Sequence, residues 1–180
     1  MKTNTKSKQV AVVIGATSKW QSDGRNTILA HGHPVDDSDV EVGVRWGVGG
    51  AIAQKFAQEV LPAMRKNGHG SFFFSNNSSS LRGKKRMTGQ SLYYPRVLMR
   101  TLAQVLTEDY SEHGVHVANI IIDGSIDSPG SRKLPRNANR RDLVINPVKI
   151  AEAYWYLHTQ DRSCWTHELQ LTPFAAKPSF

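Results

Sequence analysis

The sequence predicts an α/β fold, a reduced Rossmann-like parallel sheet of about four strands with helices on its faces. Short apolar runs rich in β-branched residues alternate with longer segments whose apolar residues recur every three to four positions. This alternation is typical of βαβ units, in which we expect right-handed crossovers. The 180 residues suffice for a domain with a buried core, so we expect one domain over 1–180.

The first strand is expected at 9–15, a β-branched run that ends in glycine. Residues 19–46 show no sustained periodicity, so we interpret them as an inserted loop. A helix is then expected from about Gly49 to Lys66, before the glycine of an Asn-Gly pair. Its apolar residues recur about once per turn: Ile52, Phe56, Val60 and Met64.

The middle of the chain predicts two more strands and a helix between them. Residues 71–75 form a short apolar run, and a polar stretch follows over 76–80. A long helix is expected from about Pro95 to Glu112, ended by His113-Gly114. The run 115–123 is the strongest strand signal in the sequence.

The last third begins with a loop. Residues 124–145 are rich in Pro, Gly, Ser and Arg, and we expect a loop on the substrate side of the sheet. Asn146-Pro147 predicts a helix N-terminus, because asparagine caps helices and proline suits the first helical position. Ile150, Tyr154 and Leu157 give that helix an apolar face, and 168–172 predicts the closing strand.

Composition excludes several classes of protein. The one cysteine, Cys164, rules out an internally disulfide-stapled fold, and no apolar run is long enough for a membrane span or a signal peptide, so we expect a cytoplasmic protein. The net charge of +8 raises the question of nucleic acid. The densest basic groups, 84–86 and 136–141, lack aromatic stacking residues or a recognition-helix pattern, so we favour solvated loops and expect no nucleic-acid partner.

A ligand site is expected beyond the carboxyl ends of the strands, where Gly15, 75–80 and Gly124 fall. Glycines between a first strand and a helix N-terminus let backbone N–H groups approach a dinucleotide pyrophosphate. Here Gly47, Gly49 and Gly50 stand at the helix, far along the chain from Gly15. Alone, this scattered set is a weak signature.

Segments 10–18 and 47–57, joined, resemble the opening of the short-chain dehydrogenase/reductase family, with 19–46 inserted inside its glycine motif. Later stretches continue the resemblance in the family's order: 61–75, 102–117, 120–130 and 164–171. The resemblance implies an NAD(P)(H)-dependent oxidoreductase acting on a small-molecule carbonyl or alcohol. It implies cofactor contacts at Gly15, Thr17, Ser18, Gly47, Val48, Gly49, Gly124 and Ile126.

In that family a tyrosine transfers the proton, a lysine one turn later lowers its pKa, and a serine binds the substrate oxygen. The chain departs from this pattern, because alignment places Leu92 at the tyrosine, Arg96 at the lysine and Asn77, beside Ser78, at the serine. Our candidate catalytic residues are Ser78, Tyr93 and Arg96.

The tyrosine assignment has an alternative. Tyr93 and Arg96 are three residues apart and would share a helical face, so Arg96 would supply the positive charge. Pro95 disfavours helical geometry at Tyr94 and would shift the helix start. In the other interpretation, Tyr93 and Tyr94 are packing residues at a helix entrance.

A second departure is a deletion. Residues 54–59 resemble the family's first helix and 60–64 a helix several elements later, so the second, third and fourth strands of the family are missing. The segment that would decide between NAD and NADP is lost with them. A non-catalytic scaffold that dimerises through the Pro95–Glu112 helix is therefore the alternative function, and a homo-oligomer is a possible assembly. We expect no metal site, since the His and Asp residues of 31–39 lack a ligand spacing.

Overall fold

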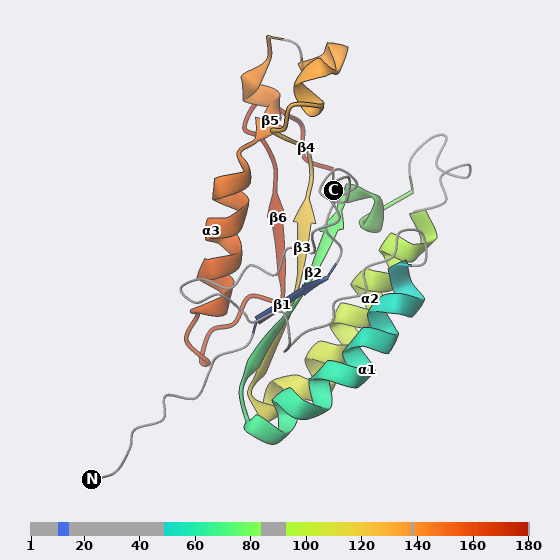
Figure 1. The fold of residues 1–180 in the computed structure, drawn as a ribbon, viewed down its shortest axis with the longest axis vertical. Helices are drawn as coiled ribbons and strands as arrows, with labels where there is room; N and C mark the ends of the chain where they lie inside the picture. Colours follow the sequence, from blue (N-terminus) through green and yellow to red (C-terminus); the bar gives the residue numbers. More distant parts are fainter. Residues whose placement is uncertain (1–10, 15–48, 84–92, 138, 180) are drawn as a thin grey trace.

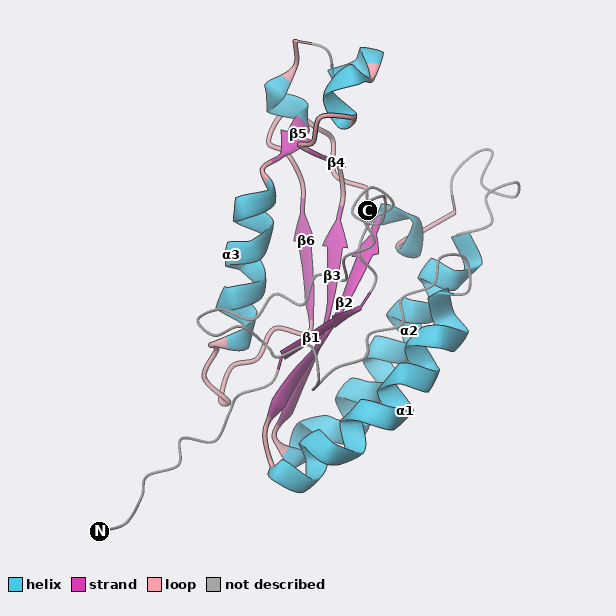
Figure 2. Ribbon diagram, viewed as in Figure 1, coloured by secondary structure: helices cyan, strands magenta, loops and turns pink. Residues whose placement is uncertain are grey.

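The computed structural model describes residues 11–14, 49–83, 93–137 and 139–179 (Figure 1). The main sheet contains β1 (Ala11–Ile14), β2 (Gly70–Asn77), β3 (Val115–Ile122) and β6 (Glu168–Leu171), paired in that order and all parallel. The long helices are α1 (Gly49–Asn67), α2 (Tyr93–Tyr110) and α3 (Pro147–His158). Figure 2 shows α1 and α2 together on one side and α3 on the other. The predicted fold class is confirmed.

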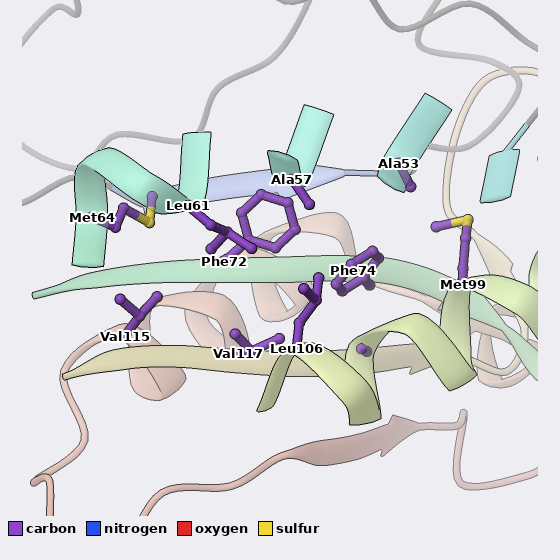
Figure 3. Packing of buried hydrophobic residues seen from close by; sticks show 11 residues of the cluster. Ala53, Ala57, Leu61, Met64, Phe72, Phe74, Met99, Leu106, Val115 and Val117 are labelled. Atoms are coloured by element: carbon purple, nitrogen blue, oxygen red, sulfur yellow. The ribbon is translucent and has the colours of Figure 1, made fainter. Parts of the chain in front are cut away.

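Helix α1 runs unbroken across the junction between its two family-like halves, as predicted. Its buried stripe is Ala53, Ala57, Leu61 and Met64, which packs on β2 (Figure 3). Phe56 and Val60, expected at the centre of the apolar face, lie partly buried at its margin. The small alanines let the helix approach the large phenylalanines of the strand.

Helix α2 begins at Tyr93, so Tyr94 is helical and the expected shift of the helix start by Pro95 is wrong. Pro95 is the third residue of the helix, where a backbone N–H has no partner within the helix, and proline is tolerated there. The α-helix ends at Tyr110. A 3₁₀ turn and Gly114, which has a φ of 78°, lead into β3.

The continuous apolar runs of β2 and β3 are explained by burial on both faces. Phe72, Phe74 and Val117 face α1 and α2, whereas Phe73 and Ile120 face α3. Successive residues of a strand point to opposite faces, so the three adjacent phenylalanines serve two separate cores. The central strands are therefore the middle layer of a three-layer arrangement.

The connections between strands do not all have the same hand. The chain crosses the sheet in one direction, from β1 through β2 and β3 to β6. Helices α1 and α2 cover one face and α3 covers the other (Figure 1). The β3–α3–β6 connection therefore has the opposite hand to the other two, and the expectation that every crossover is right-handed is wrong. With one face already covered, α3 buries the remaining apolar face.

The segment 124–145 contains more structure than the expected loop. Strands β4 (Ser125–Ile126) and β5 (Val144–Ile145) pair in parallel as a second, two-stranded sheet. Between them lie three 3₁₀ turns. Two ion pairs stabilise this segment, Arg132 with Asp127 and Arg140 with Asp142. The predicted basic group 84–86 lies outside the described residues.

Helix α3 has the predicted cap. The Asn146 side chain accepts a hydrogen bond from the Val148 backbone N–H at 2.9 Å, and Pro147 occupies the first turn. Ile150, Tyr154 and Leu157 are buried, as the apolar pattern predicts. No helix in the described part of the chain is long and apolar enough to cross a membrane.

Candidate functional site

The candidate site lies where the parallel strands end together. β2 ends at Asn77, β3 at Ile122 and β6 at Leu171. Each helix that follows a strand runs back antiparallel to it, so the N-termini of α1 and α2 also lie toward this edge (Figure 1). Open parallel sheets bind ligands at this edge, called here the ligand edge.

Ser78 begins a short 3₁₀ turn, Ser78–Ser80, directly after β2. Asn77 builds this turn: its Oδ1 accepts from the Ser79 N–H at 3.0 Å, and its carbonyl accepts from the Ser80 hydroxyl at 2.8 Å. The two residues that alignment placed at the family's serine thus have different tasks. Asn77 caps the turn, and Ser78 carries the hydroxyl at the ligand edge.

The Ser78 hydroxyl is hydrogen-bonded to Asp123, the residue that follows β3. The Asp123 carboxylate also accepts from Gln170 Nε2 at 2.9 Å and from the Ser179 N–H at 2.6 Å. Burial alone raises the pKa of Asp123, but these hydrogen bonds outweigh it and leave the pKa below its ordinary value. Asp123 is therefore a carboxylate at neutral pH, joined to the candidate serine.

Arg96 lies in the first turn of α2 and points at the backbone of β2. Its Nη1 donates to the carbonyl oxygen of Ser75 at 2.9 Å. Burial lowers the pKa of the Arg96 guanidinium, and Tyr154 opposes that shift. An arginine remains charged even so, which places a fixed positive charge near the end of β2.

Tyr154 of α3 lies beside this positive charge. Burial raises the pKa of Tyr154 to about 12, while the Ser75 side chain and the Arg96 guanidinium act against the shift. The hydroxyl faces Ser75 but forms no hydrogen bond of ordinary geometry. A fully buried phenol with a raised pKa is a poor acid/base, so Tyr154 belongs to the core.

A polar network underlies the site on the α2 face of the sheet. Asn76 Nδ2 donates to Asn119 Oδ1 at 3.2 Å and to the Arg96 carbonyl at 3.0 Å. Asn119 Nδ2 donates to Glu168 at 3.0 Å, and Arg100 forms two 2.8 Å hydrogen bonds with the same carboxylate. The network ties the start of α2 to three strands, so it fixes the backbone that carries Arg96.

The remaining predicted residues divide into four groups. Tyr93 is the first residue of α2, so it and Arg96 lie in one helix, as expected. Gly49 is the first residue of α1. Gly124 follows Asp123, and Ile126 lies in β4 and packs against the core beneath α3. The others lie outside the described residues: Gly15, Thr17, Ser18, Gly47 and Val48.

Comparison with known proteins adds to this geometry. No protein-family model and no curated protein matches the sequence. Among solved structures, the chain is similar to a serine dehydrogenase complexed with NADP+, with 16% identity and a TM-score of 0.57 over 71% of this chain and 54% of that one. Serine dehydrogenase from Escherichia coli aligns at 17% identity with a TM-score of 0.54, over 70% of this chain and 50% of that one.

An alcohol dehydrogenase from the archaeon Thermococcus sibiricus, complexed with 5-hydroxy-NADP, aligns at 16% identity with a TM-score of 0.57, over 71% of this chain and 52% of that one. Chains described as short-chain dehydrogenases recur among the matches. The described part of the chain shares a portion of the fold of these solved short-chain dehydrogenases. The resemblance stated from the sequence is confirmed at the level of the fold, and the chain spans about half the length of the structures that it matches.

Within this short-chain dehydrogenase fold, sequence reasoning missed Asp123 and Gln170. Asp123 directly follows β3, whereas Gln170 lies within β6. For Asp123, a polar residue directly after a buried strand was the available signal, since such a residue falls at the ligand edge. Among the described residues, no group of three His, Cys, Asp or Glu side chains is placed to hold a metal ion.

Proposed function

We propose that this chain binds NAD or NADP at its ligand edge and acts as an oxidoreductase on a carbonyl or alcohol, in the manner of the short-chain dehydrogenases/reductases. One observation carries the proposal. Ser78 stands directly after β2 at the ligand edge, in a fold shared with dehydrogenases whose structures contain NADP+ or 5-hydroxy-NADP. The small molecule would bind at this edge, beside the serine.

The described residues suit parts of this role. The N-terminus of α1 at Gly49 would present the backbone N–H groups of its first turn, which have no partner within the helix, to a dinucleotide phosphate. Ser78 would hold the substrate oxygen, and when bound, the nicotinamide would exchange hydride with the substrate. Tyr93 would transfer the proton, aided by the charge of Arg96 three residues later, because a phenol with a pKa near 10 needs a nearby cation to act at neutral pH.

The direct test is a titration of the purified chain with NADPH and, separately, NADH, followed by nicotinamide fluorescence. We expect saturable binding of one or both below millimolar concentration, and the tighter ligand identifies the cofactor. A linear response with both cofactors up to millimolar concentration would remove the oxidoreductase proposal.

A variant then tests the acid/base. Tyr93→Phe should abolish turnover against a panel of carbonyl substrates and leave the cofactor dissociation constant nearly unchanged, because only the phenolic proton is lost. Tyr156→Phe is the matched control, since Tyr156 is 60% exposed on α3. Turnover in Tyr93→Phe equal to that of the control would eliminate Tyr93 as acid/base.

A non-catalytic role is the second candidate, and an exposed apolar stripe on α2 favours it. Leu98 is 59% exposed and Val105 is 49% exposed. They are two helical turns apart and so lie on the same side of α2, with the exposed Thr101 between them. Such a stripe suits contact with a second copy of the chain, as in a scaffold or dimerisation module.

A further inference from the structure

The chain folds back across its own ligand edge after β6. Pro173 is buried, and it packs so closely on Gly124 that a Cβ atom at Gly124 would lie 2.8 Å from Pro173 Cδ. A turn follows, in which the Ala176 N–H donates to the Pro173 carbonyl at 3.0 Å. The bare side of Gly124, expected to face a cofactor, thus contacts Pro173, the first residue of 173–179, called here the C-terminal segment.

The far end of the C-terminal segment is held by Asp123. The Ser179 N–H donates to Asp123 Oδ2 at 2.6 Å, and Asp123 is only 8% exposed. A hydrogen bond to a buried carboxylate is stronger than a neutral one. The segment is therefore fixed at both ends, by Pro173 on Gly124 and by Ser179 on Asp123.

The same carboxylate fixes the candidate serine. An ionised carboxylate only accepts hydrogen bonds, so the Ser78 hydroxyl donates its proton to Asp123. Gln170 of β6 anchors the carboxylate with a 2.9 Å hydrogen bond, so Asp123 is held in position for both tasks.

We propose that Asp123 is a positioning residue of the ligand edge, which orients the Ser78 hydroxyl and holds the C-terminal segment as a cover over Gly124. This inference rests on the proposed function, because both concern ligand binding at the same edge of the sheet. Cofactor entry displaces the C-terminal segment. The Asp123 carboxylate holds both this segment and the Ser78 hydroxyl. Loss of the Asp123 charge therefore opens the edge and leaves Ser78 without its orientation.

The cover is tested without any ligand, by hydrogen exchange of the backbone amides of the full chain measured by NMR. Asp123→Asn and Ser179→Pro both weaken the hold on the segment, and Ser179→Pro does so by removing the N–H and hydroxyl donors of Ser179. We expect the Ala176 amide to exchange about tenfold faster or more in both variants, since local opening becomes easier. Phe174→Ala is the control, because the Phe174 side chain is 91% exposed in the same segment.

Unchanged exchange at Ala176 in both variants would overturn the cover. If Asp123→Asn does not fold, Ser179→Pro decides the question alone, because it leaves the carboxylate and its contacts with Ser78 and Gln170 in place.

The positioning role is tested with NADPH and a turned-over substrate. Both variants should bind NADPH about threefold tighter or more, because a cover reduces apparent affinity by the fraction of time that it is closed. Turnover should fall only in Asp123→Asn, where Ser78 is no longer oriented. A merely structural role would weaken binding and turnover together, and that result would overturn the assignment.

The two proposals fail in different ways. Absence of NADPH binding in the wild type and in both variants would remove the proposed function, while the exchange experiment would still decide whether Asp123 holds the cover. If the wild type binds NADPH and neither variant binds it more tightly, the proposed function stands. The C-terminal segment then does not restrict cofactor binding.

Discussion

Arg96 Nη1 donates a hydrogen bond to the carbonyl oxygen of Ser75, 2.9 Å away, one residue beyond the last pairing of β1 with β2 at Ile14–Phe74. This is the last pair among the described residues of β1, Ala11–Ile14. Arg96 supplies a side-chain donor to the next carbonyl of β2. The residue aligned with the family's catalytic lysine thus also supports the backbone of the sheet.

Replacement of Arg96 should therefore destabilise the fold as well as affect any activity. Arg96→Met leaves the Ser75 carbonyl without its charged donor, and we expect the free energy of unfolding to fall by about 1.5–3 kcal/mol. Arg65→Met is the control, since Arg65 is exposed in the last turn of α1. Urea unfolding measures both. Equal stabilities of the two variants would contradict the structural role of Arg96.

The two left-handed glycines that flank the N-terminal ends of β2 and β3 should respond differently to alanine. Gly68 has a φ of 69° and open space where a Cβ atom would lie, whereas Gly114 has a φ of 78° and a Cβ there would lie 2.3 Å from the Gly68 carbonyl oxygen. Gly68→Ala incurs only the left-handed strain, about 1–2 kcal/mol. Gly114→Ala adds a backbone clash and should cost clearly more in thermal or urea unfolding. A smaller loss at Gly114 would show that the Gly68 turn moves aside freely.

Acid should destabilise the protein through the buried His116 and the half-buried His158. Burial lowers the pKa of His116. The neighbouring His167 and His158 lower it further, and hydrogen bonds to backbone carbonyls act in the opposite direction. Burial also lowers the pKa of His158. The unfolded chain, with histidine pKa values near 6.5, then binds protons that the folded chain does not. Stability is complete above the unfolded pKa and is lost as pH falls from there through the folded values.

The measurement is the free energy of unfolding at pH 7.5 and at pH 5.5, where most carboxylates remain charged. His158→Gln removes one titrating group, and its amide can still bond to Ser71, which contacts His158 Nδ1 at 2.9 Å. The loss of stability between the two pH values should be smaller in this variant than in the wild type. An identical loss in the variant would exclude His158 as a source of the pH dependence.

Self-association is tested on the exposed stripe of α2. Leu98→Glu combined with Val105→Glu should abolish any dimer that the wild type forms, because two charges would be buried at the contact. Val148→Glu on α3 is the control, since Val148 is 60% exposed on the other side of the sheet. Sedimentation velocity measures the assembly. A dimer that survives the double substitution would place the contact elsewhere.

Local patterns predicted most elements of this fold, and long-range relationships account for what they did not predict. The apolar periodicity of α1, the Asn146-Pro147 cap and the β-branched run of β3 act over a few residues, and each predicts its element directly. The paired strands β4 and β5 are two residues long and nearly twenty apart, so neither carries a pattern of its own. The hand of the α3 connection depends on which face the earlier helices already cover.

The candidate site follows the same division. Ser78 was placed by its position after a strand, a local feature. Asp123 acquires its role from Gln170 and Ser179, which lie about fifty residues away and meet it only when β3 and β6 pair. Pro95 illustrates the opposite error, because its local bias at Tyr94 does not prevent α2 from beginning at Tyr93.

The most direct test of the central claim is hydrogen–deuterium exchange of the full chain with and without saturating NADPH. The ligand edge predicts added protection in the peptides that contain the Ser78 turn and Asp123-Gly124, with none at the opposite ends of the strands around Val115. Protection confined to the opposite ends, or no change anywhere at millimolar NADPH, would contradict a dinucleotide site at the carboxyl ends of this sheet.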